Sequence, residues 1–340
     1  MDDLAFGTRD KRGNWTPTKK LEIAPVFVFP PRPAALLKWL PHYLFPWNFL
    51  FALSAVLYWY LVIPEVATLK VLSWDWALRL LLVNAIAVFL FYGVFELFLY
   101  SKRSQNNQFK YNARFPADHK NSAFFFQNQN IDSLIRGFGT GVPIWTLLEV
   151  LGLHAYALGI GTWWNFSEHP LYLFCLALVL PILHETHFYL IHRLIHTPFL
   201  YKWVHSVHHN SVNPSPWSSL SMHPVEHLLY FSSIFYHLLI PSNPILMLYQ
   251  IHFAGFGAIV GHIGFDQIKL SDKYSMNTNA YAHYLHHKYF EVNYGDASVP
   301  LDKWFGTWHD GTAEGERLMQ ARFEARKAQA EAKKMLSEKS

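Results

Sequence analysis

The sequence is poor in charge and in cysteine, and both shortages narrow the possibilities. Only 15% of its 340 residues are Asp, Glu, Lys or Arg, whereas soluble globular proteins average about 25%. A single cysteine, Cys175, excludes an intrachain disulfide and any metal motif built on cysteine pairs. The first twenty residues are polar, so we expect no cleavable signal peptide. The net charge of +4 is mild and favours membrane headgroups over nucleic acid as its counterpart.

Long apolar stretches take the place of the missing charge. A helix needs roughly 20 apolar residues to cross a bilayer. Five stretches reach or approach this length: residues 45–64, 76–100, 138–160, 170–191 and 228–262. The third is interrupted by Pro143, and the last suits a hairpin of two short helices that turns at Pro241 and Pro244. The sequence therefore predicts an all-α, multi-pass transmembrane bundle rather than a soluble protein with buried helices.

The distribution of positive charge predicts the orientation of this bundle. Lys and Arg gather in the arm 1–44 and in the loop 101–137, whereas the connection 161–169 has neither. Under the positive-inside rule, the arm and this loop face the cytoplasm. We expect a cytoplasmic arm (1–44), a transmembrane domain (45–310) and a charged helical tail (311–340). Following the spans along the chain, the histidine-rich part of 184–310 becomes a cytoplasmic helical cap.

Histidine is abundant, and its spacing is more informative than its number. Nine of the twenty histidines lie between His184 and His227. Three clusters have the spacing of neighbours on a helix surface: His192 and His196; His205, His208 and His209; His283, His286 and His287. Eight clustered imidazoles exceed the ligands of one metal ion, which predicts two metal ions.

The ligand type leaves the identity of the metal open. The run His184-Glu185-Thr186-His187 is one residue too short for the His-Glu-x-x-His motif of zinc proteases. No Glu-x-x-His occurs, which argues against a soluble carboxylate-bridged di-iron bundle. Imidazole alone is compatible with iron, zinc or copper.

The motifs together resemble the fatty acid hydroxylase superfamily of sterol desaturases, sterol methyl oxidases and lipid hydroxylases. The matching runs are Glu185…Phe188-Tyr189…His192-Arg193…His196, His205…His208-His209, His223-Pro224…Glu226, His283…His286-His287 and Asn293-Tyr294-Gly295. One departure is Leu301-Asp302-Lys303, where Trp-Asp-Arg is usual. The resemblance implies a helical membrane enzyme with a non-haem di-iron centre, O₂ as oxidant and a lipid substrate.

The resemblance also implies a ligand set. One iron would be held by His192, His196, His205, His208 and His209, the other by His283, His286 and His287, with His262 and His223 as further candidates. Glu185 lies seven residues before His192, so both project from nearly the same helix face. We expect Glu185 to accept an imidazole N–H and fix the tautomer of a ligand.

The expected function is an O₂-dependent hydroxylation or desaturation of a membrane lipid. The expected substrate is a sterol or sterol-like molecule. A fatty acyl or sphingoid chain is the alternative substrate. The chain lacks a dinucleotide fingerprint and a haem attachment motif, so we expect electrons from a separate cytochrome b5, or from a ferredoxin with its reductase. We expect the endoplasmic reticulum membrane in a eukaryote and the inner membrane in a bacterium.

Two functions from other classes fit the histidine pattern less well. A transition-metal transporter would carry His or Asp in the middle of its spans, whereas these clusters lie just beyond the span ends. A membrane cytochrome would need histidine pairs on facing helices at mid-membrane rather than three imidazoles within one helical turn.

Overall fold

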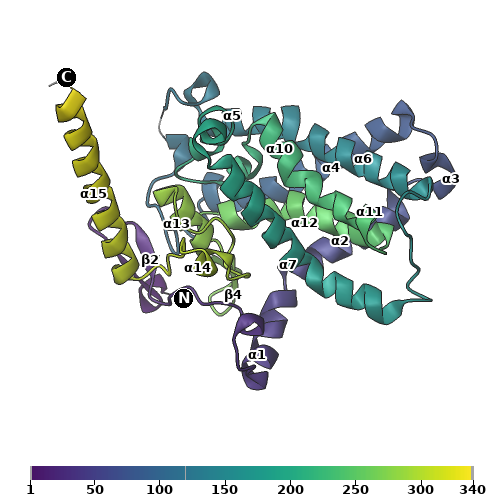
Figure 1. The fold of residues 1–340 in the computed structure, drawn as a ribbon, viewed down its shortest axis with the longest axis horizontal. Helices are drawn as coiled ribbons and strands as arrows, with labels where there is room; N and C mark the ends of the chain where they lie inside the picture. Colours follow the sequence, from purple (N-terminus) through teal and green to yellow (C-terminus); the bar gives the residue numbers. More distant parts are fainter. Residues whose placement is uncertain (1, 119, 338–340) are drawn as a thin grey trace.

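The computed structural model describes residues 2–118 and 120–337 and is built mainly of helices (Figure 1). The longer helices are α1 (Pro33–Leu44), α2 (Trp47–Leu61), α4 (Trp74–Phe95), α6 (Val142–Ala157), α7 (Pro170–Ile195), α12 (Pro244–His262) and α15 (Ala313–Ser337). The shorter ones are α3 (Val66–Leu69), α5 (Gln129–Arg136), α8 (Pro198–Leu200), α9 (Ser206–His209), α10 (Pro224–Phe231), α11 (Tyr236–Leu239), α13 (Tyr281–Tyr289) and α14 (Leu301–Trp304). The predicted all-α class is confirmed.

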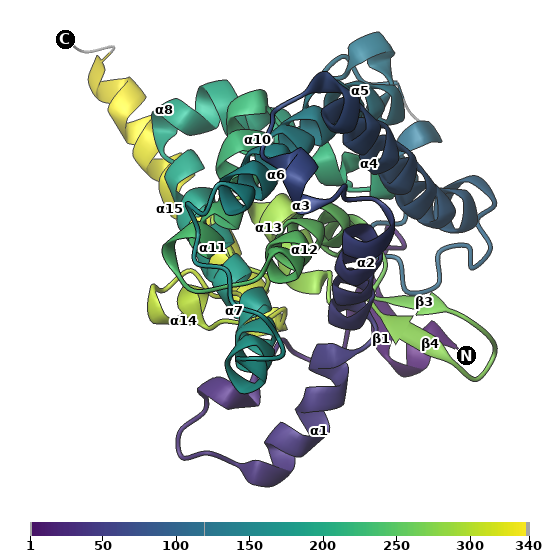
Figure 2. The same ribbon diagram turned by 90° about the vertical axis from the view of Figure 1, so that its right-hand side faces the viewer.

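Among residues 2–118 and 120–337, strands occur only in two small antiparallel hairpins, which the sequence analysis does not predict. They are β1 (Gly7–Arg9) with β2 (Trp15–Pro17), and β3 (Gln267–Lys269) with β4 (Ser275–Asn277). Figure 2 shows both on the side of the molecule that carries the N-terminus. The β3–β4 hairpin contacts the start of α2, where the Trp47 indole N–H donates to the Asn277 carbonyl at 3.0 Å.

Within the described part of the chain, four helices are long and apolar enough to cross a membrane, and their bounds are Trp74–Ser101, Gln129–Ala157, Pro170–Ile195 and Pro244–His262. A fifth span results if α1 and α2, which meet at a bend of 46°, are counted as one. The third helix begins at Gln129 rather than at residue 138, because a π-helical turn (Gly137–Gly141) joins the polar α5 to the apolar α6. Hydropathy alone does not register the polar first two turns.

The segment 228–262 forms the expected helical turn, but only its second arm is long enough to span. The first arm is divided into α10, a 3₁₀ turn (Ser232–Phe235) and α11. At this change from α10 to the 3₁₀ turn, the Ser232 hydroxyl donates to the Leu229 carbonyl at 2.7 Å. The second arm, α12, is continuous from Pro244 and lies at the centre of the bundle, packed against α2, α6 and α7.

Contacts between the connections define two ends of the bundle. At one end His154 donates to the Leu69 carbonyl, and the Ser242 N–H donates to the Thr162 carbonyl. At the other end the Tyr100 hydroxyl contacts the Ile263 carbonyl and Gln129 donates to the Asn213 carbonyl. Tyr100 also contacts the Pro214 carbonyl, and His209 contacts His196 at the end of α7. The turn that follows α4 (Glu96–Ser101), the ends of α7 and α12 and the beginning of α5 therefore lie at the same end. α13 and α15 extend from this end, opposite α3 (Figure 1).

The packing of α12 against α6 depends on a glycine. Trp145 on α6 is fully buried, and a Cβ atom added to Gly255 would overlap its indole ring. We expect Gly255→Ala to lower the free energy of unfolding by about 1–3 kcal/mol through overpacking, although alanine is the better helix former. Unfolding in detergent, followed by tryptophan fluorescence, measures this change.

Gly139 is the matched control for this prediction. It is also a helical glycine, and an added Cβ would meet no atom within 4 Å. Gly139→Ala should be neutral or slightly stabilising. Equal stability of the two variants would contradict the packing argument.

Candidate metal centre

Nine of the ten candidate histidines converge at one end of the bundle, from four segments. These are the end of α7 with His192 and His196, the π-helical turn η7 (Tyr201–His205) and α9 with His205, His208 and His209, the end of α12 with His262, and α13 with His283, His286 and His287. Eight of the nine are buried, and His196 is half-buried.

The nine imidazoles form two groups in which the nearest ring nitrogens lie within 4.8 Å of one another. The first group is His192, His196, His205, His209 and His286, and the second group is His208, His262, His283 and His287. The ligand set implied by the resemblance puts His208 with His192 and His286 with His283. In the structure, His286 lies in the first group and His208 in the second group. Adjacent residues on a helix project about 100° apart, so His208 and His209 point to different groups, as do His286 and His287. The i, i+4 pairs stay together.

The inward-facing Nε2 atoms are very close to one another. In the first group, Nε2 of His286 is 3.1 Å from that of His209 and 3.2 Å from that of His196. In the second group, Nε2 of His262 is 3.1 Å from that of His208 and 3.3 Å from that of His283. Two nitrogens bound to one ion at about 2.1 Å are separated by about 3.0 Å at a right angle and about 3.4 Å at a tetrahedral angle. Both groups therefore have the spacing of ligands around a single ion.

The outward-facing Nδ1 atoms fix the tautomers of several rings. Each of four rings donates its Nδ1–H to a backbone carbonyl oxygen. His192 donates to Tyr294 and His286 to Val292, both at 2.7 Å. His262 donates to Ala258 at 2.8 Å and His208 to Ser221 at 3.3 Å. A neutral ring that donates through Nδ1 presents a lone pair at Nε2. The contact between His208 and His262 is thus between two acceptors, which a cation between them would satisfy.

Burial keeps these imidazoles in the neutral form that binds metals. Desolvation lowers the pKa of His286 to about 4 and holds the pKa values of His205 and His208 well below the usual 6.5. Neighbouring imidazoles lower them further because two positive rings would repel. At neutral pH the lone pairs are available, so the residues fit two metal ions.

The acidic partner of a histidine is Glu226 rather than Glu185. Oε1 of Glu226, at the start of α10, lies 2.8 Å from Nδ1 of His205, and both side chains are buried. Burial raises the pKa of Glu226, and a bound cation nearby would favour its ionised, hydrogen-bond-accepting form. Glu185 instead accepts the Val299 N–H at 2.9 Å. Among the residues described, it makes no hydrogen bond to a histidine.

The remaining histidines near the cap have structural partners. His223 caps α10 by accepting the Val225 N–H at 3.1 Å, and it stands outside both groups. His187 bonds to the Tyr236 hydroxyl and the Leu229 carbonyl. His227 bonds to the Leu220 carbonyl, and His184 lies 3.4 Å from Gln250 while lining the cavity described next.

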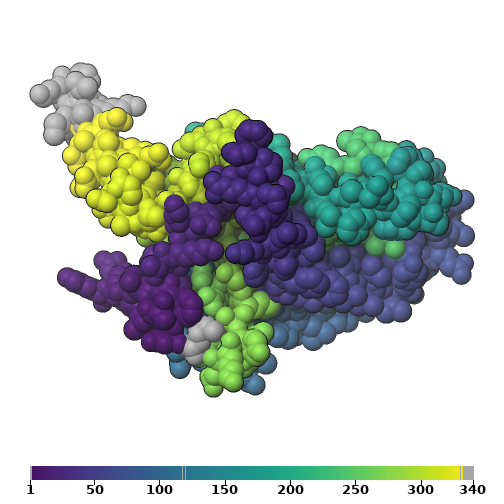
Figure 3. Space-filling model, turned by 90° about the horizontal axis from the view of Figure 1, so that it is seen from below, coloured from purple at the N-terminus to yellow at the C-terminus, as the bar shows by residue number. Residues whose placement is uncertain are grey.

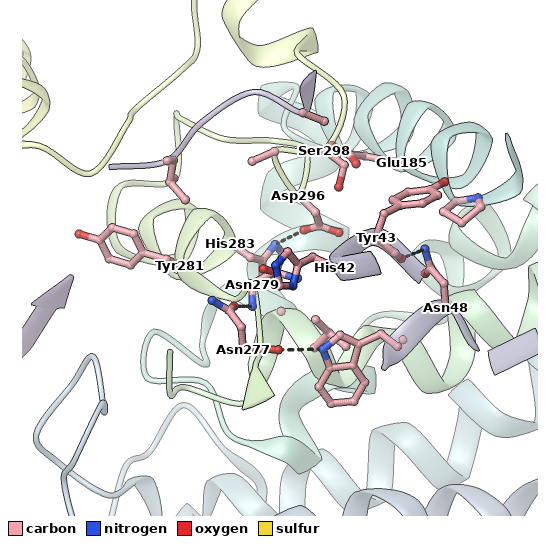
Figure 4. A pocket seen from close by; sticks show the side chains of 18 of the residues that line it. His42, Tyr43, Asn48, Glu185, Asn277, Asn279, Tyr281, His283, Asp296 and Ser298 are labelled. Atoms are coloured by element: carbon pink, nitrogen blue, oxygen red, sulfur yellow. Dashed lines mark hydrogen bonds and ion pairs between the residues drawn. The ribbon is translucent and has the colours of Figure 1, made fainter. Parts of the chain in front are cut away.

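A cavity of about 1180 Å³ leads to the histidines. Its walls come from the N-terminal arm, α1, α2, α7, α12 and the segments around α13, and its inner end reaches His192, His208, His262 and His283. The N-terminal residues lie across this face of the molecule (Figure 3). Around the cavity, His42 and Asn279 stand near Asp296 and His283, with Tyr43 and Asn277 farther from them (Figure 4). A chamber of this size, largely apolar and closed at one end by metal-ligating groups, suits a small hydrophobic molecule.

The geometry agrees with what comparison with known proteins finds. Residues 176–307 match the family model described as fatty acid hydroxylase, and this segment contains both groups of histidines. No solved structure matches the chain.

Several curated relatives are sterol desaturases of fungi. The Delta(7)-sterol 5(6)-desaturase ERG3A of Gibberella zeae is 29% identical over 157 residues, which cover 44% of this chain and 40% of that protein. The Delta(7)-sterol 5(6)-desaturase ERG3 of Saccharomyces cerevisiae is 34% identical over 123 residues, or 35% and 32% of the two chains. The chain thus spans less than half the length of these relatives. The resemblance to the fatty acid hydroxylase superfamily is confirmed over residues 176–307, the segment that forms the histidine centre.

Proposed function

We propose that this chain is a membrane oxygenase that holds two iron ions and hydroxylates or desaturates a lipid. One observation carries the proposal: two groups of buried imidazoles present their Nε2 atoms 3.0–3.3 Å apart at the closed end of a large cavity. The spans Trp74–Ser101, Gln129–Ala157, Pro170–Ile195 and Pro244–His262 fit a membrane protein. The fungal desaturases support the choice of iron and of a sterol-like substrate.

The protein's part in this reaction begins with holding the ions. The first group would hold one ion and the second group the other, with Nδ1–H groups anchored on backbone carbonyls and on Glu226. When bound, iron supplies the activation of O₂ and the removal of hydrogen from an unactivated C–H bond. The anchored rings keep the ligand positions fixed, so binding an ion requires little rearrangement.

Aromatic side chains control what reaches the inner end. Phe188 lines the cavity and packs against His192, with ring centroids 4.7 Å apart, and against His283 at 6.0 Å. Tyr230 packs edge-on against Phe188 at 5.8 Å. These rings give the inner end an apolar surface beside the histidines. They therefore favour the approach of a hydrocarbon segment over that of a polar group.

The outer end of the cavity meets surface suited to lipid. α1 and the segment before it line the mouth and expose Leu37 to 73% and Phe29 to 91%. α2 and α7 also expose apolar side chains, among them Leu61 on α2 and Leu171 on α7. The exposed side chains near the mouth extend this lipid-facing surface. A lipid substrate would then pass from the bilayer into the cavity without crossing water.

Electrons must come from a partner, since the chain offers no nucleotide-binding or haem motif. A cytochrome b5, or a ferredoxin with its reductase, would serve. By the positive-inside rule the histidine end faces the cytoplasm, where such carriers are available. The endoplasmic reticulum would be the compartment in a eukaryote and the inner membrane in a bacterium.

Expression in a sterol-producing host tests the proposed function. We compare the lipids of cells that produce the wild-type protein, His208→Ala or His223→Ala by mass spectrometry. The wild type should yield a lipid two hydrogens lighter or one oxygen heavier. His208→Ala should abolish that product, and His223→Ala should retain it because His223 lies outside both groups.

The identity of the new lipid separates the two substrate classes. An altered sterol supports a sterol substrate, and an altered acyl or sphingoid chain supports a fatty acyl or sphingoid substrate. A product that persists in His208→Ala would contradict the proposed centre.

A further inference from the structure

The wall of the cavity beside the second group carries an acidic side chain without a protein partner. Asp296 lines the cavity, and its Oδ1 lies 3.6 Å from Nδ1 of His283, which is too long for a hydrogen bond. Its side chain is 48% exposed and makes no hydrogen bond to any residue in 2–118 or 120–337. In Figure 4 the carboxyl group points into the cavity next to His283.

The surroundings of Asp296 contain further unused hydrogen-bonding capacity. Nδ1 of His283 is buried without a hydrogen-bond partner in the described chain. Glu185 is only 5% exposed, lines the same wall and uses one oxygen on the Val299 N–H. With Nε2 directed at His262 and His287, Nδ1 of His283 carries the proton and is one donor at this point of the wall. The carboxylates of Asp296 and Glu185 offer more acceptor positions than this donor and the Val299 N–H fill. The wall can therefore accept a further hydrogen-bond donor.

Apolar side chains also line the cavity, which limits what that donor can belong to. They include Phe51, Phe188, Phe253, Val260 and Ile182. A second cation is unfavourable beside a metal group. A hydroxyl group on an otherwise hydrophobic molecule satisfies both parts of the wall.

We propose that Asp296 recognises a hydroxyl group of the lipid substrate and thereby selects lipids that carry a hydroxyl close to the carbon that is oxidised. This inference rests on the proposed function. It also sets the orientation of the substrate, with its hydroxyl end beside His283 and its hydrocarbon end toward α1 and the bilayer.

Distances agree with a short spacing between hydroxyl and reacting carbon. The imidazole ring and a metal–nitrogen bond of about 2.1 Å put the Asp296 carboxyl within about 8 Å of an ion held by His283. In a sterol, the 3-hydroxyl carbon is two bonds from C5 and three bonds from C6. A sterol hydroxyl bound to Asp296 therefore leaves these carbons within reach of the metal groups, whereas the end of a long acyl chain has no such donor.

Ligand discrimination tests the inference without turnover. We measure the affinities of a Δ7-sterol and of its 3-methyl ether, which cannot donate a hydrogen bond, for the iron-loaded protein in nanodiscs. The wild type should bind the free sterol about 10- to 100-fold more tightly, as expected for a hydrogen bond to a charged group. Asp296→Ala should reduce this preference to near unity, and Asp296→Asn, an isosteric variant, should reduce it partly.

Asp272→Ala is the matched control because Asp272 is an exposed carboxylate outside the cavity; it should keep the full preference. Equal binding of both ligands by the wild type, or full preference in Asp296→Ala, overturns the inference. Loss of metal in Asp296→Ala with unchanged preference would instead make Asp296 a positioning residue for His283. If a lipid product forms although the protein binds the free sterol and its methyl ether equally, only this inference fails. If the protein prefers the free sterol but yields no product, only the proposed reaction fails.

Discussion

Replacing His208 and His287 together should leave one metal site at wild-type affinity. Replacing His208 and His209 together should weaken both sites, so that neither keeps wild-type affinity. The first pair removes two of the four ligands of the second group and leaves the first group intact. The second pair takes one ligand from each group. Loss of an outer partner of a ligand already costs about 10- to 100-fold in metal affinity, so we expect loss of a direct ligand to cost more. Metal titration of the purified double variants measures both affinities.

The two variants also separate the structural grouping from the grouping by sequence order. If the three boxes acted as units, His208→Ala/His209→Ala would spare the site of His283, and His208→Ala/His287→Ala would damage both sites. That reversed result would contradict the arrangement in the structure. Circular dichroism of both variants controls for loss of helical structure.

The second large effect concerns the carboxyl that supports the first group. We expect Glu226→Ala to weaken the first metal site by about 10- to 100-fold, since Nδ1 of His205 would lose its buried partner at 2.8 Å. Glu226→Gln keeps an acceptor and should weaken the site less. The second metal site should retain wild-type affinity in both variants.

Glu185→Gln is the comparison that decides between the two carboxyls. Glu185 contacts the Val299 N–H and makes no hydrogen bond to a histidine among the described residues, so its replacement should leave both metal affinities unchanged. A weakened site in Glu185→Gln with a normal site in Glu226→Ala would restore the prediction made from helix periodicity. Competition with a chelator resolves differences of this size.

Helix periodicity and hydropathy predict much of the fold because they report local properties. The spans at 76–100 and 170–191 are apolar along their whole length and appear nearly as expected. The α5 turns are missed because they are polar, and the break at Ser232 is missed because no proline or glycine marks it in the sequence. The β3–β4 hairpin depends on contacts far along the chain, including Gln105 with Lys269.

The membership of the histidine centre is predictable, but its internal arrangement is not. Spacing brings the i, i+4 pairs to one face, as with His283 and His287, yet it does not determine which neighbouring helix meets that face. His286 joins the first group because the Val292 carbonyl turns its ring toward His196 and His209. Glu226 is far from His205 in sequence and is brought to it only by the packing of α10.

Asp296 illustrates a residue that sequence reasoning passes over. It lies directly after the Asn293-Tyr294-Gly295 run and has no spacing relation to a histidine. Its significance comes from the cavity that the N-terminal arm and α1 complete. Only the folded chain shows that this carboxyl faces the cavity.

The most direct test of the oxygenase assignment is the O₂ dependence of lipid oxidation by the purified protein. The iron-loaded protein, supplied with a reductant and host lipids in nanodiscs, is incubated with and without O₂, and the lipids are analysed by mass spectrometry. We predict a species two hydrogens lighter or one oxygen heavier only when O₂ is present. Unchanged lipids in the presence of O₂, from protein that holds two iron ions and an active reductant, would contradict the account.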